Sequence, residues 1–148
     1  MNYSFTNEAL DAILSGLNIN ENDVVLAVGG SGDQGFAMLE YAKQVKLCDI
    51  NHAQVKFIMD MIWLLRKGDY SEFLAGGFGL LDGAYFGFQK PERAKLELGR
   101  RNIYLKEDGR LGKIRGRLDN LIVEPCDIFE AAFRDYGYTK LYLSNVCF

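Results

Sequence analysis

Short apolar runs alternate along the chain with segments in which apolar residues recur at helical spacing. The runs at residues 24–28, 45–48, 121–123 and 141–146 have the length of strands, and the first is apolar throughout, as in a parallel strand covered on both faces. Strands that alternate with helices predict an α/β fold. We expect a Rossmann-like parallel sheet of strand order 3-2-1-4, in a single domain (1–148) that is incomplete at its C-terminus.

Two of the expected helices lie near the ends of the chain. Residues 7–17 show a stripe of leucine and isoleucine, and Thr6 precedes it as a candidate N-cap. Residues 127–136 are expected to form the crossover helix after the third strand. The glycine-rich and aromatic region 74–88 predicts no regular element, and is either a lid over an acceptor pocket or a loop packed on the core.

A longer helix is expected over residues 51–66, with Asn51 as its N-cap. This segment contains good helix formers and neither glycine nor proline. Its apolar residues run nearly all the way round the helix, which predicts deep burial. We therefore place Met59, Met61 and Trp63 in the core.

Composition limits the classes of function. The chain has 148 residues, 49% of them apolar, and a net charge of −3, which indicates a globular domain with no specific affinity for nucleic acid. Its cysteines, Cys48, Cys126 and Cys147, are far apart in sequence and predict reduced thiols rather than a disulfide framework or zinc site. The first residues lack the basic start and apolar core of a signal peptide, and no apolar run reaches the roughly 20 residues of a membrane span, so we expect neither export nor membrane insertion. We expect a cytoplasmic protein.

A glycine-rich turn follows the first strand, and Asp49 ends the second. Strand, glycine turn, helix, strand and carboxylate, in that order, are typical of a nucleoside-binding α/β half. Gly30, Gly32 and Gly35 would allow a tight turn and a close approach of ligand and helix. Asp49 would accept hydrogen bonds from two ribose hydroxyls. This stretch therefore predicts a nucleoside pocket.

The segment from Gly30 to Gly35 also matches G-x-G-x-x-G, the dinucleotide fingerprint, so a nicotinamide-dependent oxidoreductase is one interpretation. Asp33, however, would place a carboxylate where the pyrophosphate must sit. S-adenosylmethionine has no phosphate and carries a sulfonium and an ammonium, so it suits Asp33 better. Asp127 would then accept from the adenine amino group, and Ser144-Asn145 would face the amino-acid part.

Three short motifs resemble one known family. They are D-I-N-H-A-Q at 49–54, D-Y-S-E-F at 69–73 and L-S-N at 143–145. They resemble the motifs D-x-N-P-A-Q, D-Y-x-x-F and L-S-D/N of the S-adenosylmethionine:diacylglycerol 3-amino-3-carboxypropyl transferases. The resemblance covers roughly residues 22–74 and 118–147.

The resemblance implies a class I methyltransferase-like fold that uses S-adenosylmethionine as donor, with a small-molecule or lipid acceptor. The reaction would be displacement at a carbon beside the sulfonium, giving methyl or 3-amino-3-carboxypropyl transfer. The residues expected to bind the donor are Gly29, Gly30, Ser31, Gly32, Gly35, Asp49, Ile50, Asn51, Gln54, Asp127, Ile128, Ser144 and Asn145. His52, which stands where the family has proline, is a candidate general base together with Asp69 and Tyr70. No metal site is expected.

Two other stretches suggest partners. Residues 93–117 hold nine of the 17 basic residues against three acids, and form either a solvated, charged helix and hairpin or a surface for anionic head groups at a membrane. Here Pro91 is expected to start a helix that Gly99 ends. The strand at 140–147 would leave an exposed apolar edge, so we expect either that the chain is the front part of a longer protein or that it self-associates there. A binding module without turnover is a second interpretation of the whole chain, because no general base is evident.

Overall fold

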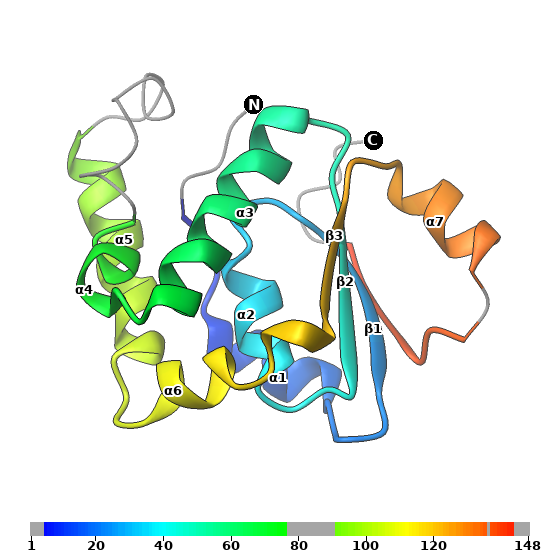
Figure 1. Cartoon of the computed structure of the whole chain (residues 1–148), viewed down its shortest axis with the longest axis horizontal. Coiled ribbons are helices and arrows are strands. Elements are labelled where there is room, and N and C mark those ends of the chain that lie inside the picture. The colour runs from blue at the N-terminus through cyan, green and yellow to red at the C-terminus, as the bar shows by residue number, and fades with distance from the viewer. Residues whose placement is uncertain (1–4, 77–90, 136, 144–148) are drawn as a thin grey trace.

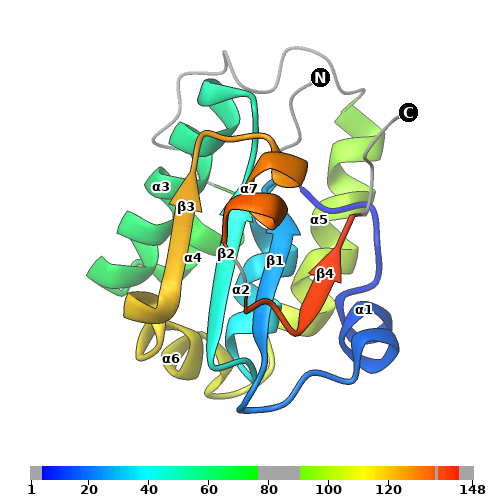
Figure 2. The ribbon, with the colours of Figure 1, turned by 90° about the vertical axis from the view of Figure 1, so that its right-hand side faces the viewer.

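The computed structural model describes residues 5–76, 91–135 and 137–143 (Figure 1). Four parallel strands form one sheet in the order β3-β2-β1-β4, which confirms the predicted α/β class and strand order. The strands are β1 (Val24–Val28), β2 (Gln44–Cys48), β3 (Leu121–Glu124) and β4 (Lys140–Tyr142). Figure 2 shows the sheet face-on, with β2 and β1 in its middle.

The register of the strands brings their carboxyl ends to one edge. Val28 at the end of β1 pairs with Cys48 at the end of β2, and Cys48 pairs with Glu124 at the end of β3. The residues that directly follow these strands therefore lie close together. Open α/β sheets bind their ligands at this edge.

The helices before β3 lie on one side of the sheet and a single described helix lies on the other (Figure 1). The first group is α1 (Leu10–Leu17), α2 (Asp33–Leu39), α3 (His52–Lys67), α4 (Tyr70–Leu74), α5 (Pro91–Leu105) and α6 (Arg110–Arg115). A 3-10 turn, η2 (Leu118–Asn120), leads into β3, and α7 (Ile128–Arg134) covers the opposite face.

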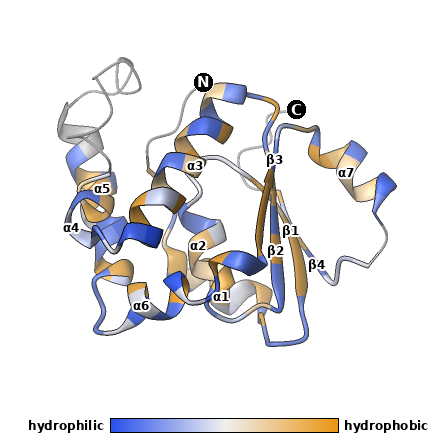
Figure 3. Ribbon diagram, viewed as in Figure 1, coloured by the Kyte–Doolittle hydropathy of each residue, from blue (hydrophilic) through white to orange (hydrophobic). Residues whose placement is uncertain are grey.

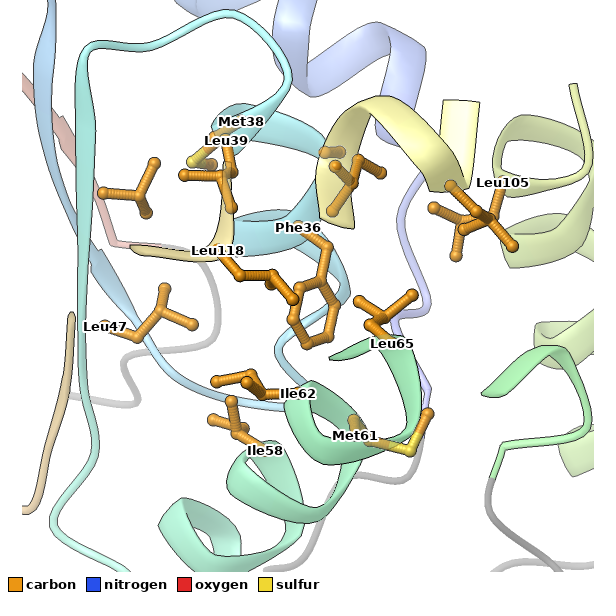
Figure 4. Packing of buried hydrophobic residues seen from close by; sticks show 14 of the residues in the cluster. Phe36, Met38, Leu39, Leu47, Ile58, Met61, Ile62, Leu65, Leu105 and Leu118 are labelled. Carbon is orange, nitrogen blue, oxygen red and sulfur yellow. The ribbon is translucent and has the colours of Figure 1, made fainter. Parts of the chain in front are cut away.

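Strand β1 is buried from both sides because its alternate residues enter two cores. Val25 and Ala27 belong to the main core, between the sheet and the larger group of helices, whereas Leu26 belongs to a smaller core under α7. In the main core, Phe36 lies among side chains from several elements, including Leu65 and Leu118 (Figure 4). Figure 3 shows the strands as largely apolar and the helices as two-sided. The continuous apolar run of β1 follows from this double burial.

Side-chain caps fix the starts of α3 and α7. The Asn51 side chain accepts a hydrogen bond from the amide of Ala53 at 3.0 Å, so the predicted N-cap is confirmed. The Asp127 carboxylate accepts from the amide of Phe129 at 2.7 Å in the same way. At its other end, α3 stops at Gly68, whose φ of 78° is in the left-handed region that favours glycine.

The first helix begins later than expected. It starts at Leu10 with Ala9 in the N-cap position and no side-chain cap, so the assignment of Thr6 as N-cap is wrong. The Thr6 hydroxyl instead accepts from the amide of Glu8 and from the side-chain amide of Gln34. Thr6 is therefore part of the packing against α2 rather than of the helix start.

Helix α5 does not end at Gly99 but continues to Leu105, and α6 follows it in place of the expected hairpin. An exposed glycine inside a helix costs only about 1 kcal/mol relative to alanine, which the rest of a 15-residue helix outweighs. None of the described helices is both long and apolar enough to cross a membrane.

Helix α3 is less buried than its composition suggested. Met61 is 1% exposed, as predicted, but Met59 and Trp63 are each 49% exposed, so their assignment to the core is wrong. The helix packs with one face only, and these two side chains lie on the other. The Nζ atom of Lys67 lies 4.1 Å from the centre of the Trp63 ring, so this indole makes a cation–π contact at the surface.

Two expectations lie wholly or partly outside the described residues. Most of the glycine-rich and aromatic region does so, from residue 77 onwards. Strand β4 occupies an edge of the sheet beside β1, but residues 144–147 of the proposed self-association surface are not described. Pairing of two chains through this strand stays a prediction.

The packing of α2 on the sheet predicts opposite effects for two glycine substitutions. A Cβ at Gly35 would come within 2.6 Å of the Leu47 side chain, whereas a Cβ at Gly99 would meet no described atom within 4 Å. We expect Gly35→Ala to lower the free energy of unfolding by about 1–3 kcal/mol, as overpacking does. Gly99→Ala should raise it by about 0.5–1 kcal/mol. Urea denaturation measures both, and equal effects would contradict this packing.

Candidate functional site

A tight turn joins β1 to α2 at the carboxyl edge of the sheet. The amide of Gly29 donates to the carbonyl of Cys48, and the amide of Gly32 donates to the carbonyl of Gly29, both at 2.8 Å. Gly30 and Gly32 have φ angles of 48° and 82°, in the region that favours glycine. The turn expected at this place is present.

Asp49 connects this turn to the start of α3. Its Oδ2 accepts from the amide of Gly30 at 3.0 Å, and its Oδ1 accepts from the amide of Asn51 at 2.9 Å. The side chain is half-buried. An ionised carboxylate has about four acceptor sites, so these two amides leave room for further donors. Two neighbouring hydroxyl groups would be suitable donors.

Most glycines of the turn are required by the protein itself. A Cβ on Gly29, Gly32 or Gly35 would in each case come within 3.2 Å of a neighbouring side chain. Gly30 differs, because a Cβ there would meet no described atom within 4 Å. The turn is therefore closed towards the core and open at Gly30.

Asp33 lies beneath the turn and not beside a ligand. It is 1% exposed, and its Oδ1 accepts from Nε of Arg101 at 2.5 Å. Its Oδ2 accepts from the amide of Thr6 at 3.1 Å and from the Ser31 hydroxyl at 2.9 Å. The expectation that its charge would face the ligand does not hold, because Arg101 neutralises it inside the protein. The Ser31 side chain likewise points inwards.

Arg101 is the buried residue beneath the turn that the sequence analysis missed. It is fully buried, its guanidinium lies 4.5 Å from the centre of the Phe73 ring, and its Nη1 donates to the carbonyl of Leu74 at 3.4 Å. Its Nη2 and the Oε1 of Gln34 find no hydrogen-bond partner among the described residues. The surrounding basic sequence predicted a surface, and the need for a buried cation became evident only from the burial of Asp33 in the structure.

Several basic side chains of residues 93–117 bind groups of the protein itself. Arg110 and Lys113 bind the Glu40 carboxylate at 2.9 and 3.1 Å, and Arg117 donates to backbone carbonyls at the end of α2. With Arg101, these are four of the nine basic residues in this stretch. Lys95, Arg100, Lys106 and Arg115 are exposed, Lys113 is half-exposed beside Glu40, and the side chain of Arg93 lies outside the described residues. Any surface for anionic head groups depends on this smaller set.

The residues just after Asp49 differ from one another in polarity and burial. Ile50 is 75% exposed and offers an apolar surface, whereas Gln54 is buried at 3% exposure. Asn51 caps α3 with its side chain. His52, the first residue of α3, is exposed and is the one catalytic candidate that the structure places beside the turn.

The other two catalytic candidates lie elsewhere. Asp69 and Tyr70 begin α4, beyond the far end of α3. Because α3 has 16 residues, its ends are about 24 Å apart. The Asp69 carboxylate is used as an N-cap, accepting from the amide of Glu72 at 3.2 Å. The structure therefore does not bring these two residues together with Asp49.

The remaining donor-binding candidates follow β3 and β4. Asp127 lies at the same edge as Asp49, and one of its oxygens caps α7. Ile128, the first residue of α7, is buried in the smaller core between this helix and the sheet. Ser144 and Asn145 lie outside the described residues.

A charged cluster lies under α7, close to the ends of β2 and β3. Lys46 pairs with Glu124 at 3.0 Å and with Asp135 at 2.7 Å. Burial lowers the pKa of Lys46, but its hydrogen bonds to the two carboxylates outweigh that effect and raise it overall. The same bonds hold the pKa values of Glu124 and Asp135 below their usual range. All three groups are therefore charged at neutral pH.

Two cavities lined by described residues lie away from the glycine turn. The larger, about 720 Å³, lies between α1 and α5 and is bordered by Leu14, Tyr41 and Ile103 among others. The smaller, about 290 Å³, lies between α7 and β4. The described residues also include no group of three or more side chains able to hold a metal ion.

Comparisons of the chain with protein-family models, curated proteins and solved structures find no match.

The buried ion pair makes a specific prediction about stability. Arg101→Ala leaves the Asp33 carboxylate buried without a cation, so we expect it to lower the free energy of unfolding by about 3–5 kcal/mol. Arg100→Ala, one position earlier on the exposed side of α5, should change it by less than about 0.5 kcal/mol. Urea denaturation of the two variants measures the difference.

A double variant separates the charge from the packing. Asp33→Asn combined with Arg101→Met removes both charges and keeps apolar bulk, so it should recover part of the stability lost in Arg101→Ala. If Arg101→Ala and Arg100→Ala cost the same, the ion pair does not support the turn.

Proposed function

We propose that the chain binds S-adenosylmethionine at the carboxyl edge of the sheet and transfers a methyl or 3-amino-3-carboxypropyl group from it to a small-molecule or lipid acceptor. The observation that carries this proposal is the position of Asp49, which two backbone amides fix beside a glycine turn that is open at Gly30. A carboxylate in this place is suited to the two hydroxyls of a ribose. The motif at 49–54 supports the choice of donor.

The residues around Asp49 would each take one part of the donor. Ile50 offers an exposed apolar surface to the adenine ring, and the free oxygen of Asp127 would accept from the adenine amino group. The open side of the turn at Gly30 would admit the amino-acid part. Because the sulfonium supplies a good leaving group, the task of the protein is to position and desolvate the donor and acceptor.

A specific observation favours each of two other functions. A module that binds the nucleoside without turnover is favoured by the distance of Asp69 and Tyr70 from the turn, which leaves His52 as the one candidate base beside it. A nicotinamide dinucleotide is favoured by the inward orientation of Asp33, because its paired charge no longer opposes a pyrophosphate. The ligand itself must therefore be tested.

A panel of ligands separates these functions. The full chain is heated with S-adenosylmethionine, S-adenosylhomocysteine, methylthioadenosine, NAD or NADP, each in excess. A ligand at about 100 times its dissociation constant stabilises the folded state by about 2.7 kcal/mol, which raises the melting temperature. We expect S-adenosylmethionine and its two nucleoside products to do so. Stabilisation by NAD alone would favour the oxidoreductase, and no stabilisation by any ligand would contradict the site.

A second experiment tests where the ligand sits. Asparagine tolerates a positive φ, so Gly30→Asn should fold while its side chain fills the open side of the turn. We expect the affinity for S-adenosylmethionine to fall at least about tenfold, or about 1.4 kcal/mol.

The matched control for that variant is Gly109→Asn. Gly109 also has a positive φ, 77°, and open space around its Cβ position, but it lies at the start of α6. It should leave the affinity unchanged. Equal affinities of the two variants would place the ligand away from the turn. Gly32→Val is unsuitable for this purpose, because its Cβ would press on core side chains.

A further inference from the structure

Two cysteines that are 78 positions apart in sequence meet at the carboxyl edge of the sheet. The Sγ atoms of Cys48 and Cys126 are 2.6 Å apart, and both residues are free thiols. The strand register explains their meeting. Cys48 at the end of β2 is paired with Glu124 at the end of β3, and Cys126 follows Glu124 by two residues. The contact is therefore built into the pairing of β2 with β3.

We propose that Cys48 and Cys126 form a dithiol site that is oxidised reversibly to an intramolecular disulfide by exchange with a small-molecule disulfide. This inference does not depend on the proposed function. The backbone on both sides of the contact is fixed by the sheet and by the Asp127 cap of α7, so the two sulfurs meet without rearrangement of either segment. Glu124 Oε2 lies 3.9 Å from the Cys126 sulfur and accepts a weak hydrogen bond from it.

The two thiols differ in solvent exposure, and this difference determines which of them reacts first with an oxidant. Cys126 is half-buried, whereas Cys48 is 1% exposed. Burial also raises the pKa of the Cys48 thiol, which disfavours its thiolate form. Cys126 is therefore the thiol that an oxidant reaches first, and Cys48 is the resolving thiol.

The exchange takes place in two steps with glutathione disulfide as the oxidant. The Cys126 sulfur, after losing its proton to solvent, attacks one sulfur of glutathione disulfide and expels one glutathione thiolate, which leaves a mixed disulfide on Cys126. The Cys48 thiol loses its proton to solvent, its sulfur attacks the Cys126 sulfur and expels the second glutathione as a thiolate, and both glutathione thiolates take up protons from solvent. Two protein thiols are oxidised, two electrons pass to glutathione disulfide, and two molecules of glutathione are released.

The resulting bond would join the end of β2, next to Asp49, to the segment before Asp127. Both carboxylates lie at the open edge of the sheet. A reducing environment would return the two thiols, since the same exchange runs backwards with excess glutathione.

The test uses the full chain with Cys147→Ser, which removes the third thiol. The protein is equilibrated in buffers of increasing oxidised-to-reduced glutathione ratio, quenched in acid, unfolded and alkylated, and its intact mass is measured. We expect the doubly alkylated form to be replaced by an unalkylated monomer lacking two hydrogens, and a peptide map to join Cys48 to Cys126. Added dithiothreitol should restore both thiols.

Two single variants test the order of the steps. In Cys48→Ala, a glutathione adduct should accumulate on Cys126, whereas in Cys126→Ala the Cys48 thiol should stay unmodified in the folded protein. Three results would overturn the proposal, and each is read from the two-cysteine chain, whose folding is not in question. The first is that both thiols stay alkylatable at every ratio of oxidised to reduced glutathione. The second is a glutathione adduct that is not converted into the intramolecular disulfide, and the third is a disulfide that joins two chains.

Discussion

A single buried ion pair, between Asp33 and Arg101, joins the parts of this structure that lie far apart in sequence. Asp33 accepts from the N-terminal segment at Thr6 and from the glycine turn at Ser31, while Arg101 brings in α5 and the end of α4 at Leu74. Removing two charges from water is costly, and hydrogen bonds to both Asp33 oxygens and to Nε and Nη1 of Arg101 offset that cost, whereas Nη2 finds no partner among the described residues. Helix α5, which carries Arg101, therefore helps to fix the shape of the glycine turn through Asp33.

A second acidic residue holds the other end of α2. Glu40 accepts from the Tyr104 hydroxyl at 2.7 Å and from Arg110 and Lys113. Burial raises the pKa of Glu40, but these hydrogen bonds and the charge of Arg110 outweigh it and keep the pKa below its usual range. A carboxylate at the C-terminus of a helix opposes the helix dipole, and the basic residues compensate for it. The short α2 is thus held at both ends by α5 and α6.

The sequence predicted those features that depend on local pattern. The apolar run 24–28 needs burial on both faces, which a central parallel strand provides. Asparagine directly before a helical segment usually acts as its N-cap, as Asn51 does here. The same reasoning placed the glycine turn and Asp49 at one edge. The function of that edge is a separate matter, since its ligand is proposed from motifs and geometry together.

The features that sequence reasoning missed all depend on contacts between distant segments. Whether Trp63 is buried depends on what packs against α3, and the apolar pattern of α3 alone does not reveal it. Arg101 resembles its exposed neighbour Arg100 in every local respect, and differs only because Asp33 lies opposite it. The meeting of Cys48 with Cys126 depends in the same way on the pairing of β2 with β3, which joins segments 78 positions apart.

The separation of 68 positions between Asp33 and Arg101 has a consequence for the order of folding. The turn at residues 29–33 is local in sequence, but its buried carboxylate gains a cation only after the chain has closed a loop that reaches α5. Loop closure of this length costs entropy before any contact forms, which slows folding. During synthesis, the N-terminal third would therefore emerge with a half-formed turn and a solvated Asp33. The edge of the sheet that carries the glycine turn is completed late, when α5 docks.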